Sequence, residues 1–545
     1  MTTYAYHATT GKLSTLTSPA GGLTYSDDGP LQTGETFAGF VAGSVTWNYD
    51  IRFQVSNESI NGANSITFGY DIDGLLTGAG NLTYTRDSAN GLLTAATLGG
   101  TATTFTYSNF GELATEETRR GSTVLYRGAY TRDNGGRIDT RTETIGGVMA
   151  ADAYGYDLAG RLTTVTRGAA PLASYSYDAN GNRTSVTTSA GTITATYDDQ
   201  DRILTFGDRT YTHTAHGEVR SWADASGTTT LTYDVQGNLL AVNLPSGNTV
   251  EYVVDARNRR IGRKVNGVVT HRWLYQGQLR PIAELNATGA IVTRFIYGAR
   301  GVTPEYMTRG GVSYRLITDH VGSVRLVINN TSGAIAQRID YDAWGKVIAD
   351  TNPGFQPFGF AGGNYDVTTA LVRFGVRDYQ ADIGRWLSKD PIGFFGGDSN
   401  LFAYVSSDPG NAIDPEGLSE WGDYANVFEE GLIGAGQGLA ASIDGAIPFI
   451  DPLEGFGLYD EECFGLGFSK VVGGYSLEVL AGFGALRGLS ALSKTQYFKF
   501  LNNNRYLRIG PGKMRSYQGD KTPRISIGNG PKAPWNHIDL TFFGR

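Results

Sequence analysis

Apolar and polar residues alternate along most of the chain before residue 340, in short stretches rich in Thr, Val and Tyr. This period-two alternation is typical of β-strands that bury one face. Many stretches end at a Tyr-Asp pair that is followed closely by glycine, as in Tyr156-Asp157-Leu158-Ala159-Gly160. Asp and Gly favour tight turns, and Gly accepts the positive φ that such turns require. Because a second strand follows each turn, the pattern predicts a series of β-hairpins.

The Tyr-Asp-x-x-Gly pattern recurs, mostly at intervals of 19 to 26 residues. Clear copies begin at Tyr70, Tyr156, Tyr177, Tyr233 and Tyr341, and degenerate copies begin at Tyr107, Tyr130, Tyr197 and Tyr252. A single hairpin is only marginally stable in water, so the repeated hairpins are expected to pair side by side in one sheet. The tyrosines would line one face of this sheet as packing anchors. We therefore predict a mainly β repeat region over residues 1–339.

A region with a different pattern follows the repeats, at residues 340–418. It contains three Asp-Pro pairs, which begin at Asp390, Asp408 and Asp414. Asp-Pro is a good turn sequence, and an aspartate in a turn commonly bonds its own backbone. The other interpretation is that two of these carboxyls lie close together and carry out chemistry. The segments with the most distinctive spacing are Asp340-Tyr341-Asp342-Ala343-Trp344-Gly345, Arg377-Asp378-Tyr379, Gly384-Arg385-Trp386-Leu387-Ser388-Lys389-Asp390-Pro391-Ile392-Gly393 and Asp414-Pro415-Glu416-Gly417-Leu418.

These segments and the repeated hairpins resemble the Rhs repeat-associated core and the YD repeats of the Rhs family, which is related to teneurins and to the C subunits of Tc toxins. The resemblance covers roughly residues 60 to 418. It implies a β-sheet that spirals into a shell, partial or closed, around the protein's own C-terminal segment. Relatives usually carry an N-terminal delivery or closure domain, and the sequence shows none. The resemblance therefore implies a partner, either an N-terminal Rhs chain or a secretion system.

The resemblance also implies a reaction. In relatives this core carries an aspartyl-protease-like activity that cuts the chain after the final Gly-Leu. Asp390 and Asp414 would then be the paired carboxyls, and Leu418–Ser419 would be the scissile bond. Two close carboxyls share one proton, so one can activate a water while the other protonates the leaving group. Arg385 is the expected neighbour that orients or tunes the pair, and Asp408 is assigned to a turn.

The composition changes beyond Leu418. Residues 419–496 contain three Lys or Arg and eleven Asp or Glu, whereas residues 497–545 contain nine and two. Residues 419–493 are rich in small apolar residues with helical spacing in places, which predicts a helical spacer. Insertion into a membrane is the alternative role for this stretch. Residues 494–545 contain short β-like stretches between Gly and Pro turns, and we predict a small basic α+β domain there.

This basic end carries a second set of candidate residues. A histidine that moves a proton, next to Arg or Lys side chains that stabilise a phosphorane, suits a metal-independent ribonuclease. One alternative is that the domain has an ADP-ribosyltransferase-like or deaminase-like activity. The other is that His537 is a structural histidine on the surface. Neither a zinc-type spacing nor a Gly-rich phosphate loop is present, so we expect no metal and no cofactor. The candidates are His537, Asp539, Arg505, Arg508, Lys513 and Arg524.

Composition sets further limits. The single cysteine, Cys463, excludes an intramolecular disulfide framework. The start of the sequence lacks the features of a signal peptide, and no apolar run is long enough for an ordinary membrane span. We expect a polymorphic toxin that is secreted or displayed at the cell surface without a signal peptide. The family resemblance implies delivery in interbacterial competition, by contact-dependent inhibition or type VI secretion.

The partners follow from that expectation. The toxin domain would act on RNA in the cytoplasm of the target cell, and a cognate immunity protein would protect the producer. A different class of function is an adhesin of the cell surface or wall, whose aromatic-rich strands bind carbohydrate. The last alternative is an inactive Rhs remnant. Exposed tyrosines on the outer face of the sheet would favour the adhesin.

Overall fold

A computed structural model describes residues 2–418, 421–422, 496–499, 506–511, 523–528 and 536–539. The chain divides into two compact units, residues 1–457 and residues 458–545. In the first unit, the strands of one large sheet follow one another in sequence order.

The strands of the large sheet begin with β1 (Thr3–Tyr6), β2 (Leu13–Ser18), β3 (Gly21–Asp28), β4 (Leu31–Gly39), β5 (Gly43–Tyr49), β6 (Val55–Ile60), β7 (Ala63–Tyr70), β8 (Leu76–Ala79), β9 (Leu82–Arg86), β10 (Leu93–Leu98), β11 (Thr101–Tyr107) and β12 (Leu113–Arg120). They continue with β13 (Thr123–Arg132), β14 (Ile138–Ile145), β15 (Val148–Tyr156), β16 (Leu162–Arg167), β17 (Ala170–Tyr177), β18 (Arg183–Thr188), β19 (Gly191–Tyr197), β20 (Ile203–Phe206), β21 (Arg209–His213), β22 (Val219–Asp224), β23 (Gly227–Tyr233) and β24 (Leu239–Asn243). They end with β25 (Thr249–Val254), β26 (Arg260–Val265), β27 (Val268–Gln276), β28 (Arg280–Leu285), β29 (Ile291–Ile296), β30 (Tyr306–Arg309), β31 (Val312–Thr318), β32 (Val324–Asn329), β33 (Ile335–Tyr341) and β34 (Val347–Asp350).

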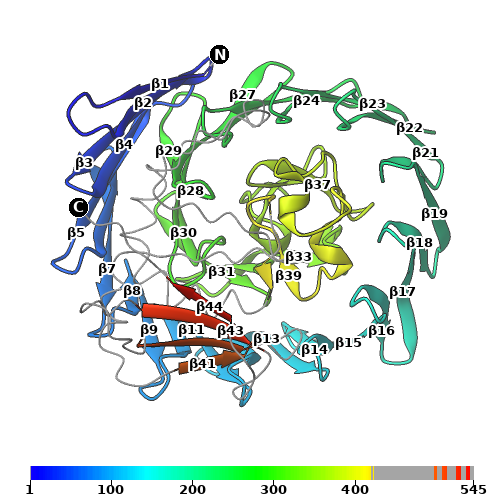
Figure 1. Cartoon of the computed structure of the whole chain (residues 1–545), viewed down its shortest axis with the longest axis horizontal. Coiled ribbons are helices and arrows are strands. Elements are labelled where there is room, and N and C mark those ends of the chain that lie inside the picture. The colour runs from blue at the N-terminus through cyan, green and yellow to red at the C-terminus, as the bar shows by residue number, and fades with distance from the viewer. Residues whose placement is uncertain are drawn as a thin grey trace. The chain divides into compact units, whose positions relative to one another are not determined.

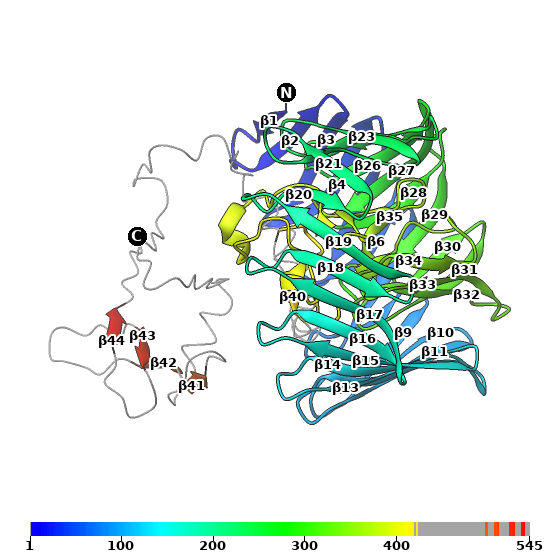
Figure 2. The same ribbon diagram turned by 90° about the vertical axis from the view of Figure 1, so that its right-hand side faces the viewer.

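These 34 strands form one antiparallel sheet in which each strand pairs with the next one in sequence. Figures 1 and 2 show the result, a meander that curves back on itself. Within the described residues, β1 and β34 each pair with a single neighbour, β2 and β33, so the sheet is open. The later strands β28 to β31 lie inside the curve of the earlier ones (Figure 1). The first unit is thus a spiral wall with two layers on one side.

The main hydrophobic core lies between these two layers. Its largest cluster joins side chains of β2 to β6, such as Phe37 and Trp47, to side chains of β26 to β32, such as Trp273 and Phe295. Smaller clusters join β8–β10 to β29–β30 and β13–β14 to β31–β32. Burial of these apolar faces drives the coiling, because a single sheet layer would leave one of them in water.

Buried ion pairs fix the register of the two layers. Each pairs a glutamate of the outer layer with an arginine of the inner layer, and all four glutamates are almost fully buried. Removing one partner of such a pair would leave an uncompensated charge in the core. The pairs are Glu35–Arg259, Glu58–Arg294, Glu116–Arg300 and Glu143–Arg325.

The repeated turn has a physical basis that the Tyr156–Arg161 copy illustrates. The Asp157 Oδ1 atom accepts hydrogen bonds from the backbone N–H groups of Ala159 and Arg161, at 2.9 and 3.0 Å, and Asp157 Oδ2 accepts one from Arg161 Nε at 2.8 Å. Gly160 takes a φ of 88°. The Tyr156 hydroxyl donates to the Ile138 carbonyl, at the start of the preceding strand, at 2.7 Å. Tyrosine therefore ties successive hairpins together while aspartate closes the turn.

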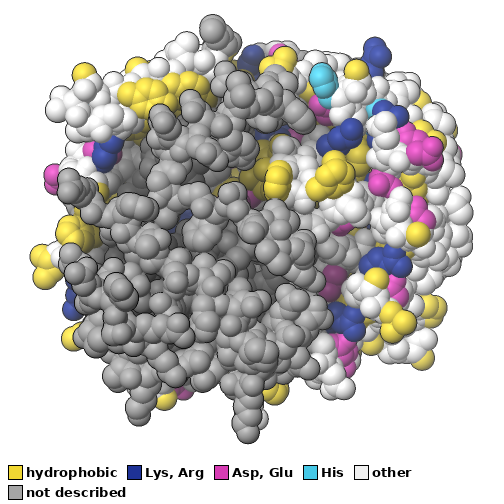
Figure 3. All heavy atoms as spheres, viewed as in Figure 1, with side chains coloured by type: hydrophobic (Ala, Val, Ile, Leu, Met, Phe, Trp, Pro, Cys, Tyr) yellow, Lys and Arg dark blue, Asp and Glu magenta, His cyan; other side chains and the backbone are white. Residues whose placement is uncertain are grey.

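Other copies repeat this arrangement. The hydroxyls of Tyr70, Tyr107, Tyr177 and Tyr197 also donate to backbone carbonyls of earlier strands. The ion pairs Asp133–Arg137 and Asp198–Arg202 repeat the link between aspartate and arginine within the turn. In the space-filling view, acidic and basic side chains lie close together along the edge of the sheet (Figure 3). The repeat tyrosines are thus structural anchors and not an exposed aromatic face.

Residues 351–418, which we call the plug, lie inside the curve of the sheet (Figure 1). Aromatic side chains form their core, and the hydrophobic residues Leu371, Ile383 and Leu387 pack on β19 to β25 of the wall. The Asp366 carboxylate receives hydrogen bonds from Arg263 and Tyr252 of the wall. The elements of this region are η1 (Phe360–Gly362), β35 (Asn364–Asp366), β36 (Leu371–Phe374), β37 (Arg377–Gln380), β38 (Arg385–Trp386), η2 (Gly393–Gly396), η3 (Val405–Ser407) and β39 (Ala412–Ile413), followed by β40 (Trp421–Gly422).

The second unit contains one antiparallel sheet in its described residues. Its strands pair in sequence order and are β41 (Gln496–Lys499), β42 (Tyr506–Pro511), β43 (Pro523–Gly528) and β44 (Asn536–Asp539). The predicted mainly β fold with a spiral hairpin shell is confirmed. The predicted helical spacer, residues 419–493, lies outside the described residues except for β40, which is a short strand. No helix in the described part of the chain is long and apolar enough to cross a membrane.

Candidate active site

Two aspartates and one arginine meet in the plug. The Arg377 Nη2 atom lies 2.8 Å from Asp414 Oδ2 and 3.0 Å from Asp390 Oδ2, so the two carboxylates lie on either side of one nitrogen. Arg377 begins β37, and its guanidinium stacks on the Trp386 ring at 4.2 Å. All three charged side chains are buried. The family resemblance supplied Asp390 and Asp414, and these two carboxyls do lie together.

Each aspartate uses its two oxygens differently. The Asp390 Oδ1 atom accepts the Ile392 N–H at 2.9 Å, and the Asp414 Oδ1 atom accepts the Leu418 N–H at 3.0 Å. These bonds are the turn contacts expected of Asp-Pro sequences. The Oδ2 atoms face Arg377. The structural role and the candidate chemical role are therefore carried by different oxygens of the same residue.

The Leu418 carbonyl and the Asp390 carboxyl both border Gly396. A side chain at position 396 would place its Cβ 2.8 Å from Asp390 Oδ2 and 2.9 Å from the Leu418 carbonyl oxygen. Both oxygens therefore face the same space beside Gly396, where any larger residue would clash. Residues 412–413 and 421–422 pair as β39 and β40, so the bond after Leu418 lies in the loop that joins two strands.

A small cavity joins these groups. It has a volume of about 30 Å³ and is lined by both aspartates, Arg377, Gly396 and Leu418, together with Leu401 and Val405. That volume is enough for one water molecule among several polar partners. The pKa of Asp390 is raised from 3.8 to about 6, mainly by burial. The charge of Arg377 opposes this rise, and the charge of Asp414 adds to it. Asp390 can therefore gain and lose a proton near neutral pH.

The arginine next to the pair differs from the sequence-based expectation. Arg385 was the expected neighbour, but its guanidinium instead donates to Asn182 Oδ1 and to the Asp201 carbonyl, both at 2.7 Å. It also lies over the Tyr197 ring at 4.7 Å. Arg385 thus anchors the plug to two repeat turns of the wall, and Arg377 holds the carboxyls. The contact depends on the path of the chain between residues 377 and 414, which local sequence does not give.

Asp408, the third Asp-Pro aspartate, lies in a turn as expected. Its carbonyl accepts the N–H groups of Asn411 and Ala412, and its Oδ1 atom accepts a bond from the Asn411 side chain at 2.8 Å. Asn411 also bonds Tyr156 of a repeat turn. This aspartate helps to fix the plug against the wall.

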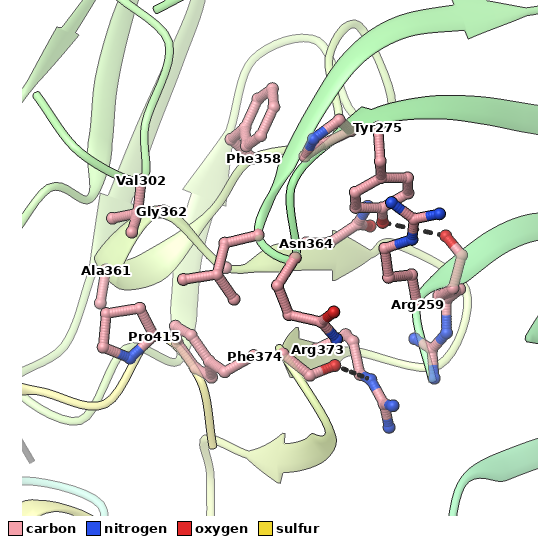
Figure 4. A pocket seen from close by; sticks show the side chains of 16 residues that line it. Arg259, Tyr275, Val302, Phe358, Ala361, Gly362, Asn364, Arg373, Phe374 and Pro415 are labelled. Carbon is pink, nitrogen blue, oxygen red and sulfur yellow. Dashed lines mark hydrogen bonds between the residues drawn. The ribbon is translucent and has the colours of Figure 1, made fainter. Parts of the chain in front are cut away.

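A larger cavity of about 40 Å³ lies between the plug and the inner layer of the wall (Figure 4). It is lined by Arg259, Tyr275, Asn364, Arg373 and Pro415, among others. The Arg373 guanidinium donates to the buried Asp378 carboxylate at 2.9 Å, and Arg260 does so at 2.8 Å. The two arginines share this one carboxylate in the packing between the plug and the wall.

The second set of candidates lies in the second unit. The register of its sheet sets Arg508 of β42 opposite Ser526 of β43, and Ser526 opposite His537 of β44. The same register sets Arg524 opposite Asp539. Residues that face each other across antiparallel strands share one face, so these four candidates occupy one face of the sheet. Arg505 and Lys513 lie outside the described residues.

A repeated Tyr-Asp hairpin, one long open sheet and an enclosed plug define a YD-repeat shell protein. The family described as Teneurin YD-shell matches residues 1–397, and the chain belongs to this family. Teneurin-4 of Mus musculus is 29% identical over 408 residues, which cover 71% of this chain and 14% of that protein. The chain thus spans a small part of the length of the curated relatives that it matches.

Two further comparisons extend the picture. The chain matches the crystal structure of TcdB2-TccC3-Cdc42 with a TM-score of 0.62 and 17% sequence identity. The match covers 79% of this chain and 25% of the chain in that structure. This likeness shows the fold alone. The tRNA3(Ser)-specific nuclease WapA of Bacillus spizizenii is 31% identical over 176 residues, which cover 31% of this chain and 8% of that protein.

Proposed function

We propose that this chain is the shell and self-cleaving plug of a polymorphic toxin, in which Asp390 and Asp414 hydrolyse the Leu418–Ser419 bond. One observation carries the proposal. The Leu418 carbonyl oxygen and the Asp390 carboxyl both lie within 3 Å of the Cβ position of residue 396, while the N–H of the same leucine is bonded to Asp414. A turn aspartate alone would not require a second buried carboxyl and a peptide carbonyl at the same point.

The proposed roles of the aspartates follow from their surroundings. Asp390, with a pKa of about 6, is the group that carries a proton, and it donates that proton to the Leu418 carbonyl oxygen. Asp414 stays ionised beside Arg377 and accepts a proton from the attacking water. Each carboxylate oxygen can accept more than one hydrogen bond, so its turn contact does not prevent this role.

The reaction consumes one water. Its oxygen bonds to the Leu418 carbonyl carbon while Asp414 takes one of its protons. Asp414 passes this proton to the Ser419 nitrogen as the bond from the carbon to that nitrogen breaks, and the proton that Asp390 gave to the carbonyl returns to Asp390. The remaining proton of the water moves from the new carboxyl to the amine, so the products are a Leu418 carboxylate and a Ser419 ammonium group. Arg377 offsets the negative charge that the two aspartates and the reacting carbonyl would otherwise accumulate.

Purification of the full chain tests this reaction. We expect a C-terminal fragment of 127 residues, 419–545, from the natural sequence. The variants Asp390→Asn and Asp414→Asn should stay intact, because each removes one carboxyl of the pair. The matched control is Asp408→Asn, an Asp-Pro aspartate outside the cavity, which should cleave normally. Cleavage that persists in both active-site variants would contradict the proposal.

We further propose that the released segment is a metal-independent nuclease that acts on RNA. Two observations support this: His537, Arg508, Arg524 and Asp539 share one face of a sheet, and a relative over part of the chain is a tRNA nuclease. Histidine would transfer the proton and arginine would stabilise the charged phosphorus intermediate. Arg505 and Lys513 remain candidates for the same role.

Expression of residues 419–545 alone in a bacterium tests the effector. Growth arrest with loss of RNA supports the nuclease, and His537→Ala should abolish both effects. Arrest with intact RNA would point to another toxin class. Normal growth with stable expression would favour the adhesin or the inactive remnant. Rescue by a protein encoded next to this chain would identify the proposed immunity partner, whereas the delivery partner requires a separate search.

The adhesin has less support. It requires aromatic side chains on the outer face, but the hydroxyls of the repeat tyrosines are bonded to backbone carbonyls of neighbouring strands. Tyr4 and Tyr6 of β1 are the tyrosines among the exposed large hydrophobic residues of the described chain. Both lie in the first strand, away from the repeats that would present a regular binding surface.

A further inference from the structure

The segment that precedes the proposed scissile bond is held firmly in the plug. The Val376 N–H donates to the Glu416 carbonyl at 3.0 Å, and Asp414 Oδ1 accepts the Leu418 N–H at 3.0 Å. Gly417 takes a φ of 69°, and a side chain there would place its Cβ 2.7 Å from the Phe374 carbonyl oxygen. Residues 414–418 therefore lie directly against the turn that leads into Arg377.

All of these contacts lie on one side of the bond. They involve residues 414–418 and the turn at residues 374–377, so hydrolysis after Leu418 would break none of them. On the other side, the described contact is the pairing of β40 with β39, which joins Ala412 to Gly422 and Ile413 to Trp421. Two paired residues give little stability by themselves. Among the described residues, 414–418 thus have more contacts with the plug than 421–422 have.

We propose that the cleaved site is a binding site for a peptide α-carboxylate, and that its ligand is the Leu418 carboxylate of its own product. This inference rests on the proposed function. Hydrolysis turns a neutral carbonyl into a carboxylate without moving it from the cavity that contains Arg377 and Asp390. Arg377 Nε has no hydrogen-bond partner among the described residues, so the guanidinium retains a buried donor. A carboxylate is the group that such a donor binds most strongly.

Occupation by the product has a consequence for activity. The cavity of about 30 Å³ is already lined by Leu418, and a second peptide would have to displace this residue. The site would therefore work once, on its own chain, and would refuse peptides supplied in solution. A released toxin segment would leave behind a shell without protease activity.

Two measurements on the cleaved full chain test this inference. The first is trimming of Leu418 by a carboxypeptidase, followed by intact mass, with a synthetic peptide of residues 408–418 as the reference. Because proteolysis follows the population of the open form, we expect trimming in the protein to be at least about tenfold slower than in the peptide. The second is incubation with a synthetic peptide of residues 410–426, which we expect to stay uncut.

Two glycine variants distinguish binding of the Leu418 end in the plug from a general effect of backbone strain. Gly417→Ala introduces a clash with the Phe374 carbonyl, so any cleaved material should be trimmed faster than the natural chain. Gly354→Ala is the control, because Gly354 also has a positive φ, of 79°, but nothing lies within 4 Å of its Cβ position. Its trimming should match that of the natural chain.

The outcomes are distinguishable. Trimming of Leu418 at the rate of the free peptide, or cutting of the supplied peptide by the cleaved chain, would overturn this inference and leave the proposed self-cleavage standing. Absence of any cleavage in the full chain would overturn the proposed function, and this inference with it. Slow trimming together with an uncut peptide is the result that the inference requires.

Discussion

Arg259 of the wall and Arg377 of the plug are buried arginines that each contact two carboxylates. Arg259 bonds through all three of its nitrogens: Nε donates to Asp255 at 2.8 Å, Nη2 to Glu35 at 2.7 Å and Nη1 to the Gly277 carbonyl at 2.9 Å, and Nη2 also lies 2.8 Å from Asp255 Oδ2. Arg377 of the plug places both carboxylates on Nη2, and its Nε has no partner among the described residues. The charges are the same, but the bonding is not.

The difference appears in the two pKa values. Burial lowers the pKa of Arg259, but the charges of Asp255 and Glu35 more than reverse this and raise it above its ordinary value. Burial also lowers the pKa of Arg377, and there the charges of Asp390 and Asp414 do not reverse it. A saturated cluster stabilises the fold, whereas an undersaturated one beside a peptide carbonyl can stabilise charge that develops in a reaction.

The largest expected effect on stability comes from the wall. Arg259→Gln leaves Glu35 and Asp255 buried without their cation, and we expect a loss of about 3–5 kcal/mol in the free energy of unfolding. Urea denaturation measures this. Arg127→Gln is the control, since its pair with Glu117 spans 3.9 Å at the surface. Equal stability of the two variants would mean that the layers are not locked by buried pairs.

The reciprocal variant in the plug should affect the reaction instead. Arg377→Gln removes the positive charge beside the carbonyl and the two carboxyls, and we expect self-cleavage to slow by about 10²- to 10³-fold. A time course of the 127-residue fragment after expression measures the rate. Arg385→Gln should loosen the plug against the wall but keep cleavage within about tenfold of the natural rate. A greater loss of cleavage rate in Arg385→Gln than in Arg377→Gln would instead assign Arg385 to the site.

The pH dependence of cleavage follows from Asp390. Its folded pKa, about 6, lies above its ordinary value of 3.8, so the protonated form that donates to the carbonyl is lost as pH rises through 6. We expect the rate to fall about tenfold per pH unit well above 6. The sign for stability agrees: protonation of Asp390 stabilises the fold below pH 4, and this contribution disappears by pH 7.

Cleavage rates between pH 5 and pH 8 test this sign, with self-cleavage stopped by acid denaturation at each time point. A rate that rises steadily with pH would assign Asp390 as the base and Asp414 as the acid. Asp390→Asn should also remove the associated pH dependence of the unfolding free energy.

Gly396 gives the smallest effect. Gly396→Ala introduces a Cβ within 3 Å of both the Asp390 carboxyl and the Leu418 carbonyl, so it should push them apart and slow cleavage by about tenfold. Gly354→Ala is again the matched control. Unchanged cleavage in Gly396→Ala would show that the close approach of these two oxygens is not required.

The repeat region could be predicted from sequence because its rules are local. The tyrosine, aspartate and glycine of each copy lie within a few residues of one another, and the turn that they form is visible in the pattern. The pairs between layers could not be predicted, since Glu143 and Arg325 are separated by most of the sheet. Nothing in the alternation of apolar and polar residues states which strands meet after the sheet has curved.

The site divides in the same way. The family resemblance supplied Asp390 and Asp414, which the structure brings together, but the neighbour expected from it was Arg385. Arg377 lies in the segment Arg377-Asp378-Tyr379, which was noted as part of the core without a chemical role. In the second unit, the strand register puts four of the candidates on one face of the sheet: Arg508, Arg524, His537 and Asp539.

The most direct test of the account is the identity of the new ends in the full chain. Intact mass and N-terminal sequencing of the small fragment should place its first residue at Ser419, and the large fragment should end at Leu418. The same preparation of Asp390→Asn should contain a single chain of 545 residues. A fragment that begins at another residue, or one that forms equally in Asp390→Asn, would contradict the assignment of this carboxyl pair to the Leu418–Ser419 bond.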